Sequence, residues 1–167
     1  MKFFFLLIFS ESELFGLFWV AFELLYFHTS AIQKLKFCHN DLLLGNILFD
    51  KVDNRVNFID HEYADFNVPT YDIANHFAEW AGLDVDWSFL PDNEQKRNWI
   101  KAYGYFSNDE MDKILEDINV MSLVCHLYWG IWAVVQSQIS KIDFDYAGYA
   151  KTKFDKMIEE DKSLRIL

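Results

Sequence analysis

The chain has 167 residues, of which 52% are hydrophobic and 19% aromatic, and its formal net charge is −11 at pH 7. This length and composition suit a single domain with a sizeable core. The negative charge argues against a nucleic-acid partner, because phosphate backbones are bound by clustered Lys and Arg, and it suits a cationic small molecule. Cys38 and Cys125 lie far apart, so the sequence suggests neither a disulfide framework nor a zinc site and fits a reducing, cytosolic setting.

Residues 1–36 form an apolar N-terminal segment whose role the sequence leaves open. Phe3–Phe9 is an apolar run that resembles the start of a signal peptide, but Ser10–Glu13 offers no small-residue cleavage site. No stretch of the first 27 residues reaches the roughly 18 uninterrupted apolar residues of a spanning helix. A helix packed on the domain is therefore favoured over a targeting or membrane segment, and a stretch foreign to the fold is the third alternative. The amphipathic pattern of Ser30–Lys36 predicts the end of a helix.

Two short apolar segments, Ile47–Phe49 and Val56–Ile59, flank the charged and turn-forming run Lys51–Asn54 and predict a β-hairpin. Side chains that carry oxygen atoms lie at its two ends: Asp41, Asn46 and Asp60. Oxygen donors at the rims of paired strands suit a magnesium-dependent phosphoryl transfer, because the protein's task there is to position reactants and neutralise charge.

The spacing of these residues sharpens that hypothesis. Asp41-x-x-x-x-Asn46 repeats the catalytic-loop pattern of kinases, in which the Asp accepts the proton of the substrate hydroxyl and the Asn holds a metal ion. Asp60 follows an apolar segment, as the second metal-binding Asp of kinases does. The residues after it are His61-Glu62-Tyr63, so the Asp-Phe-Gly signature is absent.

The remaining sequence predicts mainly helices. After a loop over Ala64–Pro69, a helix is expected over Tyr71–Ala81, ended by Gly82. A second is expected from the Asp92 and Gln95 capping pair to Tyr103. The pair Ser107 and Glu110 opens a helical stretch that we expect to break before Val120, and further helices follow. Those helices cover Asn119–Ser140 and Ala147–Glu160, and residues 161–167 form a charged tail that is expected to fray.

Several separate blocks, in the right order, resemble the choline/ethanolamine kinase family. The likeness runs from about Phe37 to Lys156 and does not cover the first 27 residues. Its blocks are His39-Asn40-Asp41, Asn46, Ile59-Asp60-His61-Glu62-Tyr63, Tyr71–Trp80 and Trp129–Trp132. Trp80–Leu83 and Val85–Trp87 resemble the ethanolamine-kinase branch more than the choline branch. The resemblance implies an α+β fold over residues 37–160, a mostly helical protein-kinase-like C-terminal lobe in which a small β-hairpin carries the catalytic loop.

The resemblance also implies the roles of the site residues. Asp41 would act on the hydroxyl of ethanolamine, and Asn46 and Asp60 would hold Mg²⁺ against the phosphates of ATP. His39 and Asp72 would support the catalytic loop, although His39 has a base as its alternative reading and Asp72 also suits a helix start. An acid and several rings would receive the ammonium group. These are Glu79, Trp129, Trp132, Phe144 and Tyr149; without the family context, the two indoles are more typical of a core.

The sequence holds six glycines but no G-x-G, so the glycine-rich loop that covers ATP in kinases is not found. We therefore expect a C-terminal lobe alone, one that binds ATP weakly and turns over little. The expected partners are ATP and a small amino alcohol, with no nucleic acid, no membrane and a cytoplasmic location; a dimer is left open. The alternatives are choline as substrate, a non-catalytic fragment that associates with a full-length kinase, and an antibiotic-type phosphotransferase, which the Trp129–Trp132 block disfavours.

Overall fold

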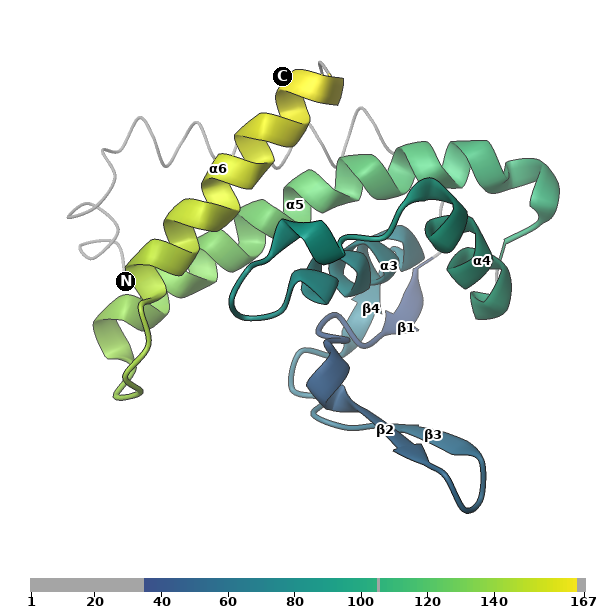
Figure 1. Ribbon diagram of the computed structural model, residues 1–167, viewed down its shortest axis with the longest axis horizontal. Helices are drawn as coiled ribbons and strands as arrows, with labels where there is room; N and C mark the ends of the chain where they lie inside the picture. The colour runs from purple at the N-terminus through teal and green to yellow at the C-terminus, as the bar shows by residue number, and fades with distance from the viewer. Residues whose placement is uncertain (1–34, 105, 165–167) are drawn as a thin grey trace.

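The computed structural model describes residues 35–104 and 106–164 (Figure 1). The predictions for residues 1–34, including most of the predicted first helix, lie outside this range. The end of that predicted helix is wrong, because Lys36 opens strand β1, Lys36–Cys38. Strand pairing with a distant segment determines the structure here, and the local amphipathic pattern does not.

Four helices form most of the described structure, as expected for a mostly helical α+β fold (Figure 1). The longest, α5, spans Met111–Ile139 and packs against α6, Tyr146–Leu164, and α3, Pro69–Ala78. The shorter α4, Asn93–Tyr103, begins with the predicted Asp92 and Gln95 capping box and ends at Gly104 in a left-handed conformation. Packing on two sides buries much of the α5 surface.

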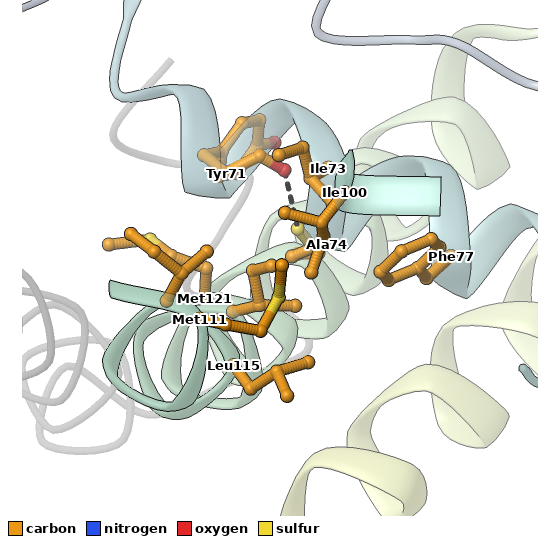
Figure 2. Packing of buried hydrophobic residues seen from close by; sticks show 11 residues of the cluster. Tyr71, Ile73, Ala74, Phe77, Ile100, Met111, Leu115 and Met121 are labelled. Atoms are coloured by element: carbon orange, nitrogen blue, oxygen red, sulfur yellow. Dashed lines mark hydrogen bonds between the residues drawn. The ribbon is translucent and has the colours of Figure 1, made fainter. Parts of the chain in front are cut away.

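The main hydrophobic core lies between α3, α5 and the end of α4, as Figure 2 shows. Burying each such apolar side chain contributes about 1.5–3 kcal/mol. Its members are Tyr71, Ile73, Ala74, Phe77, Ile100, Met111, Ile114, Leu115, Ile118, Met121 and Cys125. This core fixes α3, which in turn carries several polar residues of the site.

Helix α5 contains no break, so the predicted interruption before Val120 is wrong. The Ser107 and Glu110 hydrogen bonds do precede it, but they cap a short 3₁₀ turn, Asn108–Glu110, that leads directly into α5. Among the described residues, α5 is the helix whose length and composition would suffice to cross a membrane, yet 67% of its most apolar window is buried in the protein. Helix α6 runs to residue 164, so most of the predicted tail is helical.

The strands form two separate antiparallel pairs. β1 pairs with β4, Asp65–Asn67, in a register that places Phe37 opposite Phe66. β4 was expected to be loop, because a three-residue strand with an acid and an amide has no local signal and depends on its distant partner. β2, Ile47–Asp50, pairs with β3, Arg55–Phe58, which confirms the predicted hairpin. In Figure 1 this hairpin projects away from the helices.

Candidate active site

A short 3₁₀ turn, Leu44–Asn46, brings the catalytic-loop pair together at the root of the hairpin. Asn46 Nδ2 donates to the carbonyl of Asp41 at 2.9 Å and approaches its carboxylate at 3.4 Å, and both residues are buried. The carbonyl of Asn46 accepts the N–H of Ile59 at 3.0 Å. Since Asp60 follows Ile59 directly, the structure gathers Asp41, Asn46 and Asp60 at one place.

Asn40, which precedes Asp41, connects the catalytic loop to the rest of the protein. Its backbone has a φ of 63°, a left-handed conformation that Asn tolerates better than most residues. All four of its polar groups have partners. Its N–H donates to Asp72 at 2.7 Å, its Nδ2 to the carbonyl of Tyr63 at 2.9 Å, its Oδ1 accepts from Asn67 at 3.0 Å, and its carbonyl accepts from Asn75 at 3.1 Å. These bonds hold the backbone on one side of Asp41.

Leu42 holds the other side through its carbonyl, which accepts a hydrogen bond from His76 Nδ1 at 2.7 Å. His76 Nε2 in turn accepts from the indole N–H of Trp80 at 3.1 Å. A ring that donates at one nitrogen and accepts at the other is neutral. Burial lowers the pKa of His76, which favours the same neutral form. Helix α3 therefore fixes the backbone after Asp41 as well.

Asp72 and His39 both lie against the catalytic loop. Asp72, in the first turn of α3, also accepts the backbone N–H of His39 at 3.4 Å. The ring of His39 lies with Nε2 2.8 Å from the carbonyl of Ile59. Because a carbonyl only accepts, Nε2 carries the proton and is not free to act as a base. This arrangement favours support over base chemistry for His39.

The electrostatics of Asp41 suit a group that takes up a proton near neutral pH. Burial raises its pKa from 3.8 to about 6, with further contributions from the carboxylates of Glu79, Asp60 and Glu62, while His39 acts in the opposite direction. A general base works best when its pKa lies near the working pH. The same shift shows that Glu79 and Asp60 face the carboxylate of Asp41.

The oxygen donors fit a magnesium ion that is shared with phosphate groups. The nitrogen of the Asn46 amide is bound to Asp41, so its oxygen is turned away from that carbonyl. Asp60 is exposed and has a φ of 61°. The described residues hold no group of three His, Cys, Asp or Glu side chains suited to a metal. Mg²⁺ typically needs only one or two protein carboxylates when phosphates supply further ligands, so Asn46 and Asp60 suit it.

The two predicted indoles of α5 are connected to the catalytic loop through two short chains of contacts. Trp129 Nε1 donates to Asn75 at 2.6 Å, and Asn75 binds Asn40. Trp132 Nε1 donates to the hydroxyl of Tyr63 at 3.0 Å, and the carbonyl of Tyr63 also binds Asn40. The indole rings lie 5.5 Å apart in an edge-to-face arrangement.

The other expected ammonium-binding residues extend this aromatic cluster. Phe144 lies 5.8 Å from the ring of Tyr149, which belongs to the same buried cluster as Trp129. Glu79 follows α3 directly and is 7% exposed. Burial, followed by the charge of Glu79, raises the pKa of Tyr149, so its hydroxyl stays protonated. The five residues thus lie around one region beside Asp41.

The structure also shows site residues that the sequence did not indicate. Asn40, Asn75 and Tyr63 connect the ring cluster to the catalytic loop, and Lys153 forms an ion pair with Glu79 at 3.2 Å. The only local signals are that Asn75 lies one turn after Asp72 and that Lys153 lies one turn after Tyr149. Hydrogen bonds across more than 20 residues have no sequence pattern that would reveal them.

The family model described as choline/ethanolamine kinase matches residues 17–158. The match begins before Phe37, so the expectation that residues 1–27 lie wholly outside the family resemblance is wrong for its last part. Among curated proteins, a probable ethanolamine kinase A of Dictyostelium discoideum is 44% identical over 133 residues, which are 76% of this chain and 38% of that protein. An ethanolamine kinase of Drosophila melanogaster is 40% identical over 146 residues, which are 82% of this chain and 28% of that protein.

Among solved structures, a Plasmodium vivax ethanolamine kinase matches with a TM-score of 0.73 and 28% sequence identity, over 88% of this chain and 39% of that one. The chain thus spans well under half the length of the relatives it matches. The match covers the catalytic loop, the hairpin, α3, α5 and most of α6. The chain belongs to the choline/ethanolamine kinase family.

Proposed function

We propose that this chain contributes the acceptor half of an ATP-dependent kinase that converts ethanolamine to phosphoethanolamine, a step of phospholipid head-group synthesis. The observation that carries the proposal is the convergence of Asp41, Asn46 and Asp60 beside the acid and rings around Glu79. The relatives named ethanolamine kinase support the same substrate. A cytosolic location and small-molecule partners accompany this proposal.

In the proposed mechanism, the Asp41 carboxylate orients the hydroxyl of ethanolamine and accepts its proton, while the hydroxyl oxygen attacks the terminal phosphorus of ATP in line. Asn46 and Asp60 would hold Mg²⁺, which supplies charge neutralisation at the phosphates. Glu79 and the rings of the cluster would hold the ammonium end. Fixing both reactants in this way removes part of the entropic cost of their encounter.

Choline is the second candidate substrate. A quaternary ammonium cannot donate hydrogen bonds and relies on ring faces, whereas a primary ammonium also donates to a carboxylate. Glu79 is a buried carboxylate at the ring cluster, which favours the primary ammonium. Competition between ethanolamine and choline for the same protein would rank the two.

The direct test is transfer of phosphate from ATP to ethanolamine by the 167-residue chain, followed by ³¹P NMR. We expect low turnover that falls by about 100-fold or more in Asp41→Asn, since positioned acid–base groups contribute about that much. Asp143→Asn, an exposed acid in the α5–α6 loop, is the matched control and should keep the parental rate. Turnover by Asp41→Asn within about threefold of the parent would overturn the assignment.

A binding measurement covers the case in which turnover is too low to follow. Ethanolammonium should shift the indole N–H signals of Trp129 and Trp132 in an NMR titration, because both rings would face the bound cation. The signal of Trp99, which packs on α4 near Tyr103, is the internal control. Equal shifts at all three indoles, or no shift at any, would contradict an amino-alcohol site at this cluster.

A further inference from the structure

Lys153 is a buried lysine that the proposed mechanism does not use. It lies on α6, is 1% exposed and is among the largest side chains that the described structure buries completely. Its Nζ lies 3.2 Å from Oε1 of Glu79. A buried ammonium is costly unless it is paired, so this lysine is held in place by the carboxylate that it contacts.

The surroundings of the Lys153 ammonium resemble a binding site for an organic cation. Its Nζ lies 5.1 Å from the ring centre of Tyr149 and 5.7 Å from that of Trp87. Rings at this distance attract a cation, and a carboxylate adds a charge-assisted hydrogen bond. The protein's own lysine thus already uses one oxygen of Glu79 and one ring of the cluster.

We propose that Lys153 is the positioning residue of the amino-alcohol site: it binds Oε1 of Glu79 and leaves Oε2 to receive the ammonium of the substrate. This inference rests on the proposed function, because it takes Glu79 as the acid that binds the amino alcohol. A carboxylate has two oxygens and about four acceptor sites, so it serves two cations at once.

The reason for a positioning role lies in what happens to Glu79 without Lys153. A lone carboxylate in an apolar environment either takes up a proton or turns toward water. In both cases the acceptor that would meet the substrate is lost. Lys153 keeps Glu79 charged and fixes its rotamer, at the cost of placing a second positive charge near the substrate.

The test is a double-mutant cycle on ligand affinity. We would measure the Kd of ethanolammonium by NMR titration of the 167-residue chain and of Lys153→Met, Lys153→Arg, Glu79→Gln and the double variant Lys153→Met with Glu79→Gln. Lys153→Met should raise Kd about tenfold in the parental background and less than about twofold in Glu79→Gln. Lys153→Arg keeps the charge and should stay within about threefold of the parent.

Lys151→Met is the matched control, because Lys151 lies two residues away on the exposed side of α6 and pairs with Asp155. If Lys153→Met does not fold, Lys153→Gln replaces it in the cycle, since its amide keeps a hydrogen bond to Oε1 without the charge. An equal loss in both backgrounds, or no loss, would overturn the positioning role and leave the proposed function intact. Absence of ethanolammonium binding in the parent chain would overturn both.

Discussion

The helical body and the β2–β3 hairpin differ in how they are stabilised. The body buries α3 and α5 against one another in a continuous hydrophobic core. The hairpin leaves most of its side chains exposed, including Phe49, Val56 and Phe58. It depends on the pairing of its two strands and on the bond between Asn46 and Ile59 at its root.

The candidate site lies where these two regions meet. Asp41, Asn46 and Asp60 belong to the hairpin side, but the hydrogen bonds that fix the loop come from Asp72 and Asn75 of α3. The body therefore supplies the rigidity, and the root of the hairpin supplies the metal-binding and catalytic groups. This comparison predicts that substitutions in the body change stability, whereas those at the root change function.

The largest expected effect on stability is in the core of the body. Met121→Ala removes a fully buried side chain between α3 and α5 and should cost about 2–5 kcal/mol of unfolding free energy. Val56→Ala, on the exposed face of β3, should change it by about 0.5 kcal/mol or less. Urea unfolding followed by circular dichroism measures both, and equal costs would contradict the division between body and hairpin.

The next effect concerns the contact between the two regions. Asp72→Ala leaves the backbone N–H groups of His39 and Asn40 without their acceptor and should cost about 1–3 kcal/mol. Hydrogen exchange at Asn40 should accelerate as well. Asp65→Ala is the control, because this exposed acid bonds only to the neighbouring Phe66. Unchanged exchange at Asn40 in Asp72→Ala would show that α3 does not hold the loop.

Asp41 should reveal a cost that the site imposes on the fold. Its pKa rises from 3.8 to about 6 on folding, so its contribution to stability is present below about pH 4 and is lost as pH rises through 6. Asp41→Asn removes this penalty and should stabilise the chain by about 1–3 kcal/mol at pH 7.5 while abolishing transfer. At pH 3.5 the gain should vanish. Unfolding curves at both values test this, and destabilisation at pH 7.5 would contradict it.

The smallest expected effect is on the titration of Asp41. The charge of Glu79 helps to raise its pKa, so Glu79→Gln should move the midpoint below about 6 by a fraction of a unit. The proton uptake of Asp41 would be followed by ¹³C NMR of labelled carboxyl groups. Glu116→Gln, an exposed acid of α5, should leave the midpoint in place. A rise in the midpoint on removal of Glu79 would show that the two groups do not face each other.

The sequence predicted the hairpin, the α4 cap and the grouping of Asp41 with Asn46 because each depends on residues close together in the chain. It missed β4 and the continuity of α5, which depend on a distant strand and on burial along a whole helix. For the same reason it assigned Glu79 to the substrate alone. The buried partner, Lys153, is 74 residues away, and no local pattern indicates that pairing.

The central claim is that Asp41, Asn46 and Asp60 surround one divalent ion beside the ring cluster, and paramagnetic relaxation tests it most directly. Mn²⁺ added with ATP should broaden the amide signals of Asp41 and Asn46 at concentrations that leave Val52, at the tip of the hairpin, sharp. In Asp60→Asn the selective broadening should disappear. Broadening that is equal at Val52 and Asp41, or that persists unchanged in Asp60→Asn, would contradict the account.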